Sequence, residues 1–361
     1  MTGPSLISRY MAGRFLRAWT LILVGFALLY LAIDFMEKLN SFTNAKMDPG
    51  RILLFFAAQL PKIFGLMAPV AALVATLLVL TLMARNSEIV AFKAGGVSLL
   101  RLSRPLLAAG LGLSLLAFAL AEVAAPRTTA LANRIWEEVR RGGQASTLVK
   151  DLWIKGVRLV EHLESYDEAD GSAAGLTIIF TGEGQAVERR LSARRGRFLE
   201  GRLDLEEVMD KTYGPGRSFR LARRAGLTLP NWPAPPPGLS RADKSSEEMS
   251  SLELWRSIQR LSAEGFGPLR QRVDLQLKFA FSLLPLVMVV VGLPLGFWRE
   301  KGGSPALGIC LGLAVSFLYL IAMELARSLG YAGLLPPPLA AWLPNAVFIL
   351  FGAWLFSYLR Q

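Results

Sequence analysis

The sequence of 361 residues contains one cysteine and one histidine, and these two shortages exclude several kinds of site. The cysteine, Cys310, lies inside an apolar run, so one chain cannot form an internal disulfide or a metal site built from thiolates. The histidine, His162, lies on a strand-like segment with no second metal ligand near it, and we interpret it as structural. Without a serine, histidine and aspartate arrangement, the sequence does not favour an enzyme.

No lysine follows a glycine anywhere in the sequence, which excludes the P-loop that binds nucleotide phosphates. Any ATP that this protein uses must therefore be hydrolysed by a different polypeptide. The apolar runs also lack ionisable residues near their midpoints, where proton-coupled and ion-coupled carriers usually place carboxylates. A secondary transporter is therefore not expected.

Long apolar runs are what the sequence does have. Hydrophobic residues make up 53% of the chain, and the mean hydropathy is +0.40. The chain is too apolar for a soluble protein and not uniform enough to lie entirely in a bilayer, so we predict a membrane protein with a sizeable soluble insert. The net charge of +12 comes from basic residues beside apolar runs or within a β-like region, which favours an anionic membrane surface over nucleic acid as its counterpart.

The first third of the chain predicts three membrane crossings. Basic residues precede the first crossing, so the N-terminus is expected in the cytosol. Pro61 and Pro69 divide the second apolar region, and we expect an interfacial helix before Pro61. The third crossing is expected to end at Glu122 and Pro126, and Arg127–Arg141 is helix-like and is expected to continue it outside the membrane. The predicted crossings are Ala18–Phe35, Ile63–Met83 and Leu106–Ala124.

A polar segment, Ala84–Arg104, separates the second crossing from the third. It begins with Asn86-Ser87-Glu88, which combines residue types of a helix N-cap with an acid in the first turn, and its helix is expected to end at Gly95-Gly96. A second amphipathic piece, Val97–Leu102, follows. Two interpretations remain open: a cytosolic helix that an energy-transducing partner grips, or an ordinary basic loop that only fixes orientation.

The hydropathy falls between Arg127 and about Gly265, where short alternating runs broken by Gly, Asp and Pro replace the long apolar ones. This pattern is typical of an antiparallel β-domain with one packed face, and we expect a sandwich or a jelly roll. Arginines at alternating positions near Arg189–Arg202 either line a groove for acidic ligands or form a solvated face. The strand-like segments are Leu152–Leu163, Leu176–Thr181, Ala186–Gly214 and Arg217–Leu229.

The proline-rich stretch Pro230–Pro237 is expected to end this domain as a stiff connector. Ser250 and Glu253 then form a capping box, which predicts the start of a helix. This helix is amphipathic and is expected to rest on the membrane interface or against the β-domain. Its apolar face carries Leu252, Trp255, Ile258 and Leu261, and three more crossings follow at Leu275–Trp298, Ala306–Leu329 and Leu339–Tyr358.

These patterns predict an α+β membrane protein with six transmembrane helices and an antiparallel, jelly-roll-like β-domain on the outer side of the membrane, inserted between the third helix and the fourth. Both termini are expected in the cytosol. The predicted divisions are 1–126, with the cytosolic segment 84–104; 127–249, with the β-domain and connector; and 250–361, with the interfacial helix and the last three crossings.

Ionisable residues gather at the predicted outer ends of the crossings, where cations can attract anionic lipid headgroups. The alternative interpretation is snorkelling or local pairing, since Glu324 and Arg327 lie one turn apart and can satisfy each other. Asp34 and Glu122 are expected to orient helices or to pair with lysines. The candidates for lipid binding are Asp34, Lys38, Lys62, Lys278 and Arg327.

Several segments resemble the YjgP/YjgQ permease family, which comprises LptF and LptG. They are the basic RYMAGRFLRAW, the outer-end LAIDFMEKL, QLPKI, MAPVAALVATLLVL and RNSEIVAFKAGGVS. The resemblance covers essentially the whole chain, and LWIKG at the start of the β-domain is closer to the LptG branch. Lys62 matches a lysine that follows proline in the family, whereas Asp34 stands where LptG relatives often carry lysine.

The resemblance implies a transmembrane permease subunit of an ABC exporter that extracts lipopolysaccharide from the outer leaflet of the inner membrane and passes it to a periplasmic β bridge. The implied partners are a paralogous LptF-like permease, a cytosolic LptB-like ATPase dimer and LptC-like and LptA-like bridge proteins, with no nucleic acid. No cofactor is implied in this chain, and ATP with Mg²⁺ belongs to the partner ATPase. The implied coupling residues are Ser87, Glu88, Ile89 and Phe92.

Two other classes of protein remain open from the sequence. A mechanotransmission-type ABC subunit would move its soluble domain rather than carry lipid, and four crossings with a larger insert would be expected. A membrane-anchored scaffold or sensor would need neither the cytosolic helix nor a lipid cavity.

Overall fold

The computed structural model describes residues 6–140, 148–155, 159–167, 170–182, 187–199, 201–213, 219–230, 232, 245–263, 267–298 and 304–359. Most of the predicted connector after Pro230, the predicted cytosolic turn at 299–303, Gly265 and Arg360 lie outside these residues. The chain divides into a helical unit, Met1–Gly142 with Ser245–Gln361, and a β unit, Gly143–Lys244.

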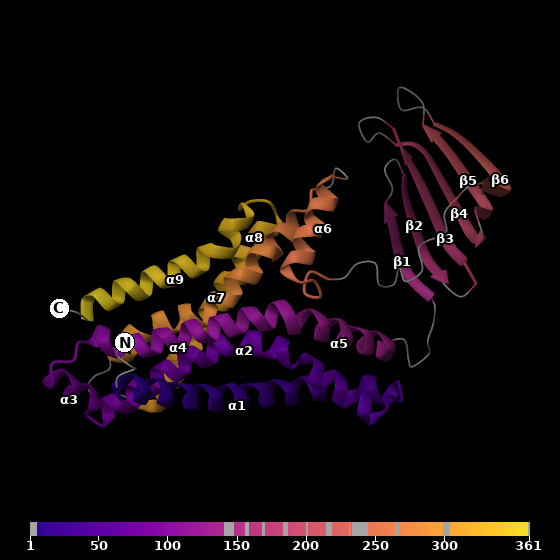
Figure 1. Ribbon diagram of the computed structural model, residues 1–361. Coiled ribbons are helices and arrows are strands. Elements are labelled where there is room, and N and C mark those ends of the chain that lie inside the picture. The colour runs from indigo at the N-terminus through magenta and orange to yellow at the C-terminus, as the bar shows by residue number, and fades with distance from the viewer. Residues whose placement is uncertain are drawn as a thin grey trace. The chain divides into compact units, whose positions relative to one another are not determined.

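Six stretches of helix in the helical unit are long and apolar enough to cross a membrane, which confirms the predicted number of crossings among the described residues. Three precede the β unit and three follow it (Figure 1). The helices are α1 (Leu6–Asn44), α2 (Pro49–Arg85), α3 (Glu88–Ala94), α4 (Leu99–Ala119), the π-helical η1 (Leu120–Ala124), α5 (Ala125–Arg140), α6 (Ser251–Ala263), α7 (Leu269–Phe297), α8 (Pro305–Tyr331) and α9 (Pro337–Leu359).

The second crossing differs from the prediction, because α2 is one continuous helix with Pro61 and Pro69 inside it. The separate interfacial helix expected before Pro61 is therefore wrong. Each proline removes one backbone donor, but close packing against neighbouring helices offsets this cost, and Pro69 itself is buried. Asp48 caps the helix start by accepting a hydrogen bond from the Gly50 amide at 2.9 Å.

The helix of the third crossing continues through Arg127–Arg140, as its helix-like sequence predicted. Helices α4 and α5 are joined through η1, so helix runs without a break past Glu122 and Pro126 to Arg140. A single π-helical turn lies just before Pro126, and such turns accommodate a local disruption of the α-helical ladder. The piece predicted at Val97–Leu102 is also not separate, because α4 begins at Leu99 and is capped by Ser98.

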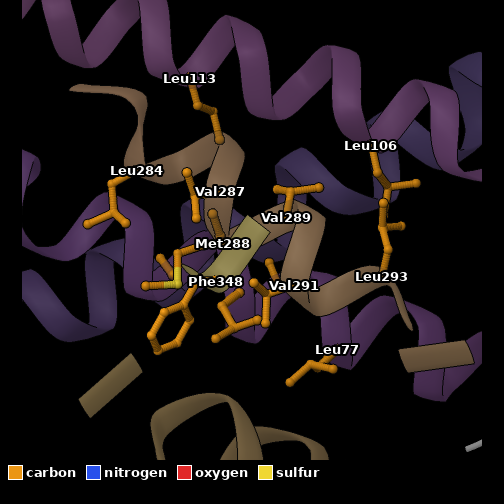
Figure 2. Close-up of a cluster of buried hydrophobic side chains, with 14 of the residues drawn as sticks. Leu77, Leu106, Leu113, Leu284, Val287, Met288, Val289, Val291, Leu293 and Phe348 are labelled. Atoms are coloured by element: carbon orange, nitrogen blue, oxygen red, sulfur yellow. The ribbon is translucent and has the colours of Figure 1, made fainter. Parts of the chain in front are cut away.

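The centre of the helical unit is formed by α2 and α7. In their most apolar windows 67% and 72% of residues are buried, against 11% in α1. Figure 2 shows apolar side chains of α2, α4, α7 and α9 pointing toward one another around Val287, Met288 and Val291. Small residues permit this closeness, since a Cβ on Gly296 would lie 2.5 Å from Leu80 Cδ1. The outer helices leave much of their apolar surface for lipid or partner chains.

The capping box that begins α6 is confirmed. The Ser250 amide donates to Glu253 Oε2 at 3.0 Å, and the Glu253 amide donates to Ser250 Oγ at 3.2 Å. The predicted apolar face is only partly correct, because α6 buries Leu254 and Ile258 while Leu252 and Trp255 are about half exposed. An α-helix has 3.6 residues per turn, so residues spaced every three positions move gradually from one face of the helix to another.

The β unit contains one antiparallel sheet of six strands, ordered β1-β2-β3-β4-β5-β6 (Figure 1). The antiparallel β-domain is thus confirmed, while the strand order among the described residues is that of a meander rather than the Greek-key order of a jelly roll. Long antiparallel strands with short connections favour hairpins. The strands are β1 (Leu148–Lys155), β2 (Leu159–Asp167), β3 (Ser172–Thr181), β4 (Val187–Leu199), β5 (Arg202–Tyr213) and β6 (Phe219–Pro230).

Apolar residues from β2 to β5 form the core of the β unit. Leu163, Ile178, Leu191 and Leu203 are fully buried in it, and they alternate with more exposed positions along their strands. Trp232 follows the last strand and packs edge-on against Phe180 with ring centroids 6.2 Å apart, so the chain returns over the sheet after β6. One face of the sheet is therefore packed, as the alternating pattern predicted.

Candidate functional site

Glu88, the first residue of α3, joins that short helix to the N-terminal part of α1. Arg14 donates from one guanidinium nitrogen to both carboxylate oxygens of Glu88 at 2.8 Å, and the Tyr10 hydroxyl donates to it at 2.9 Å. The short helix predicted to begin near Glu88 and to end at Gly95-Gly96 is confirmed. Because Tyr10 and Arg14 lie one turn apart on α1, one helix face holds the carboxylate with two donors.

The surroundings of Glu88 keep it ionised. Partial burial acts against the charged form, but hydrogen bonds from Arg14, Asn86 and Tyr10 outweigh it and hold the pKa of the Glu88 carboxyl below its ordinary value. The N-terminal position on α3 adds a favourable helix dipole. Glu88 therefore carries its negative charge at neutral pH.

The four predicted coupling residues differ in their surroundings. Ile89 is 1% exposed and belongs to the protein's own core, whereas Phe92 is half-buried and Ser87 is exposed. Ser87 adopts a left-handed conformation with φ 58° and its side chain does not cap the helix. Val90, which the sequence analysis did not select, presents the most exposed large apolar side chain of α3, at 56%.

A cavity of about 650 Å³ lies beside this helix. Its lining comes from the start of α1 and from α3, so it is formed by the same elements that the contact of Arg14 with Glu88 holds together. The lining residues are Leu6, Ile7, Tyr10, Glu88, Ala91 and Phe92. It is a mainly apolar recess with one carboxylate, which suits an apolar side chain of another protein.

A second cavity, of about 230 Å³, lies among α1, α2 and α5. It contains two of the residues predicted to bind lipid, Lys38 and Lys62, and thus brings together side chains that are 24 positions apart. The other lining residues are aromatic, amide or small: Tyr30, Phe55, Ala58, Gln59, Thr129, Ala132, Asn133 and Trp136. Two ammonium groups beside aromatic rings form a site suited to an anionic group attached to an apolar body.

Lys38 has a fixed position in this cavity. It forms an ion pair with Asp34 one turn earlier, and its ammonium group lies 5.7 Å from the ring centre of Phe55 and 5.4 Å from that of Trp136. Asp34 is 8% exposed and also accepts a hydrogen bond from Gln59 at 3.2 Å. The predicted pairing of Asp34 with a lysine is therefore found, with Lys38 as its partner.

Lys62 is held more loosely. Its ammonium group lies 2.6 Å from a carboxylate oxygen of Glu247, and the two side chains are 54% and 58% exposed. Glu247 belongs to the segment that precedes α6. An ion pair this exposed contributes little net free energy, so Lys62 can change partners at small cost.

Lys278 and Arg327, the last two candidates for lipid binding, lie outside this cavity, and each has a partner within the protein. Lys278 donates to the backbone carbonyl of Met249. Arg327 pairs with Glu324 at 3.4 Å and donates to the Tyr331 hydroxyl at 2.9 Å. The local pairing of Glu324 with Arg327 that their spacing allowed is therefore found.

The contribution of α5 to the cavity was missed, although the sequence contains a signal for it. Thr129, Ala132, Asn133 and Trp136 recur at intervals of three and four residues, which places them on one helix face. Tyr10 and Arg14 carry no comparable signal, because nothing local indicates that their partner, Glu88, lies 78 and 74 residues away. Long-range contacts of this kind require the packed fold.

The arginines of the β unit act mainly within the sheet. Arg189 binds Asp210 on the neighbouring strand through two hydrogen bonds of 2.9 and 2.7 Å, and these hold the pKa of Asp210 below its ordinary value. Arg194 lies 3.5 Å from Glu207 on the same strand pair. Across the described part of the chain, no group of three His, Cys, Asp or Glu residues is arranged to hold a metal ion.

In the part of the chain that the structure describes, six helices that can cross a membrane, with an antiparallel β unit between the third and the fourth, define a multi-pass membrane protein. The model of the lipopolysaccharide export system permease LptF/LptG family matches residues 9–358, and the chain therefore belongs to this family. A permease is a transport subunit and not an enzyme.

Two curated relatives are similar over nearly their whole length. Both are named lipopolysaccharide export system permease protein LptG, one from Escherichia coli strain K12 and one from Escherichia coli O6:H1 strain CFT073. Each is 22% identical to this chain over 342 residues, which cover 93% of this chain and 94% of the relative. The family expected from the sequence segments is thus confirmed, and both relatives belong to the LptG branch that LWIKG indicated.

Proposed function

We propose that this chain is a transmembrane subunit of an ABC exporter that extracts lipopolysaccharide from the outer leaflet of the inner membrane. Membership of the permease family supports the proposal. The observation that carries it is the cavity in which Lys38 and Lys62 lie beside Phe55 and Trp136. Phosphates of a glycolipid headgroup pair with the lysines, while its apolar part packs on the aromatic rings and the lipid-facing helices.

The proposed orientation puts α3 and both termini in the cytosol, and the cavity with the β unit in the periplasm. Arg9, Arg14 and Arg17 near the start of α1 support it, because basic residues flank the cytosolic ends of membrane helices. The cavity then lies at the height of the outer-leaflet headgroups. Phosphates at this depth are partly dehydrated, so each lysine contact exceeds the value of a fully exposed pair.

The proposed drive is a cytosolic ATPase dimer that binds α3, with ATP and Mg²⁺ on that partner. Val90 and Phe92 provide apolar surface for it, and Glu88 fastens α3 to Arg14 on α1. Helix α1 continues from Arg14 to Lys38, about 36 Å at 1.5 Å per residue. Movement of α3 is thus passed by a single helix to the lysine cavity at the opposite end.

The proposed route out of the membrane runs through the β unit to a periplasmic β-protein. Among the described strands, β1 and β6 have a neighbour on one side only, so each offers an edge for strand addition. Photocrosslinkers placed singly along Phe219–Pro230 should trap the bridge protein at alternating positions. Adducts along the central strand β4 instead, with none on β1 or β6, would contradict transfer through an edge.

Native mass spectrometry of the purified full-length complex tests the whole proposal. We expect this chain, a paralogous permease and two copies of an ATPase, with lipopolysaccharide bound. A complex with the ATPase but without glycolipid, even after added lipopolysaccharide, would favour a mechanotransmission subunit. The chain alone, without ATPase or lipid, would favour a scaffold.

A further inference from the structure

A short acidic segment, here called the acidic strap, connects four elements at the end of the helical unit that holds the lysine cavity. It comprises residues 245–251, with the sequence SSEEMSS. Glu247 pairs with Lys62 of α2, and Glu248 accepts a hydrogen bond from Asn133 of α5. At its far end, the Ser251 amide donates to both carboxylate oxygens of Glu122 in η1 at 3.0 Å, and the Met249 carbonyl accepts from Lys278 of α7.

Two of these four contacts are made to residues that line the cavity. Lys62 and Asn133 both belong to the lining, and each is bound by a carboxylate of the strap. The strap carboxylates therefore occupy positions where an anionic ligand of the cavity would place its own oxygens. A carboxylate and a phosphate accept hydrogen bonds from the same ammonium and amide donors.

The two lysines of the cavity differ in how firmly their carboxylate partners are fixed. Asp34, the partner of Lys38, is 8% exposed and has a second hydrogen bond from Gln59. Glu247, the partner of Lys62, is 58% exposed at its side chain and has Lys62 as its one ion-pair partner among the described residues. Asp34 thus stays bound when a ligand enters, whereas Glu247 can be exchanged for a ligand anion at little cost.

We propose that Glu247 is a built-in counter-ion that competes with ligand anions for Lys62, is displaced when the cavity binds anionic lipid, and thereby lowers the affinity of the cavity for that lipid. The inference rests on the proposed function and adds a contact that the lipid must break on entry and that re-forms on its release. Glu247 is tethered next to Lys62, so it acts at a high effective concentration. Any ligand phosphate that binds Lys62 has to displace Glu247, and a headgroup with several phosphates can do so because it has more charge and more than one attachment point.

The expected size of the effect follows from the exposure of the pair. Exposed ion pairs change an equilibrium by up to about five-fold. With each lipid below saturation, Glu247→Gln should therefore raise capture of lipopolysaccharide in the cavity by about two- to five-fold, and should raise capture of phosphatidylglycerol by no more than that. A purely structural contact would not produce this gain, because its loss would leave lipid capture unchanged or lower it.

The experiment uses the full-length chain with its copurifying partners in nanodiscs of phosphatidylethanolamine, with a photocrosslinking residue in place of Tyr30 in the cavity lining. Lipopolysaccharide and phosphatidylglycerol are added together, and both adducts are quantified. Glu138→Gln is the matched control, because Glu138 forms an equally exposed ion pair with Arg51 but neither residue lines the cavity. Glu247→Asp should keep capture near the wild-type amount, and Glu138→Gln should leave it unchanged.

Two outcomes would overturn the inference. One is unchanged or lower capture of lipopolysaccharide in Glu247→Gln while wild type captures it. The other is an equal gain in Glu138→Gln, because loss of any exposed carboxylate would then be sufficient and competition for Lys62 would not be needed. If wild type itself captures no lipopolysaccharide at this position, the proposed function fails instead, so the two failures are distinguishable.

Discussion

Single residues decide how α3 is attached to the rest of the helical unit, and Glu88 is the most important of them. Glu88 should act through Arg14, because the guanidinium donates to both of its carboxylate oxygens. Glu88→Ala and Arg14→Ala should each reduce copurification of the ATPase, and the double variant should be no worse than either single one. Residues that act as one contact give such non-additive effects.

The control for this cycle is Lys46→Ala, which removes a basic residue at the other end of α1 and should leave ATPase copurification unchanged. Quantitative copurification from matched membranes measures all four variants. Additive losses in the double variant would show that Glu88 and Arg14 contribute separately, and the role of their contact would then be abandoned.

Glu161 predicts how the β unit responds to pH. Glu161 is 5% exposed, and burial raises the pKa of its carboxyl to about 7. The indole N–H of Trp232 acts in the opposite direction, but it makes no hydrogen bond and so lowers this pKa only a little. The folded state therefore holds a proton that the unfolded state releases above its ordinary pKa of 4.5. Stability should fall as the pH rises from about 4.5 to about 7, and should change no further above that range.

Hydrogen exchange measures this effect in the full-length chain. Amide protection factors in β2 and β3 should be lower at about pH 8 than at about pH 5, after correction for intrinsic exchange rates. Glu161→Gln should abolish the difference, whereas Glu164→Gln, an exposed position on the same strand, should retain it. Equal pH dependence in both variants would assign the effect to another group.

At this scale the sequence identified chemically suitable residues better than it identified their partners. Glu88, Lys38 and Lys62 each line a cavity. They could be selected from the sequence because a charged residue beside an apolar run costs free energy unless it makes a favourable contact. Ile89 was expected to contact a partner protein but is part of this protein's own core. A helix this short is too brief to show which of its faces is apolar. The partners Arg14 and Glu247 come from distant segments and could not be predicted.

At the scale of whole elements, the crossing of α2 and α7 organises the helical unit. A Cβ on Gly296 would lie 2.5 Å from Leu80 Cδ1 and 2.9 Å from Leu80 Cβ, so the two helices are as close as glycine allows. Gly296→Ala should destabilise the protein by about 1–3 kcal/mol through overpacking. Thermal unfolding of the full chain in detergent should show a lower midpoint.

Gly112→Ala is the matched control, because Gly112 also lies in a membrane-spanning helix but nothing would lie within 4 Å of its added Cβ. Replacing glycine in an open helical position favours the helix by about 0.5–1 kcal/mol. Its unfolding midpoint should be equal or slightly higher. A midpoint for Gly296→Ala as high as that of Gly112→Ala would mean that the crossing adjusts without cost.

Element types could be predicted from hydropathy and turn residues, while their boundaries could not. The capping box located the start of α6, because its two hydrogen bonds involve only neighbouring residues. Pro61 was expected to separate two helices, yet it lies inside α2. Tertiary packing decided this position, and no local pattern reports it.

At the scale of the whole molecule, six crossings and an inserted antiparallel β-domain could be predicted, because bilayer thickness imposes a strong signal on each crossing. The strand order could not be predicted, since the strands of meanders and of jelly rolls show the same alternation of apolar and polar residues. The lysine cavity could not be predicted either, because α1, α2 and α5 contribute to it from distant parts of the sequence. Family membership then connects this architecture with lipopolysaccharide export.

The central claim is that the cavity around Lys38 and Lys62 receives the glycolipid that the complex extracts. The most direct measurement is ATP-dependent release of lipopolysaccharide from proteoliposomes that contain the assembled complex, with a soluble bridge protein as acceptor. Wild type should release lipopolysaccharide only with ATP. Lys38→Gln/Lys62→Gln should assemble normally, because the amide introduced at position 38 can still donate to Asp34, and it should keep its basal ATPase rate but lose most of the release, because the phosphates lose both cationic partners. Release at the wild-type rate from this double variant would contradict the account.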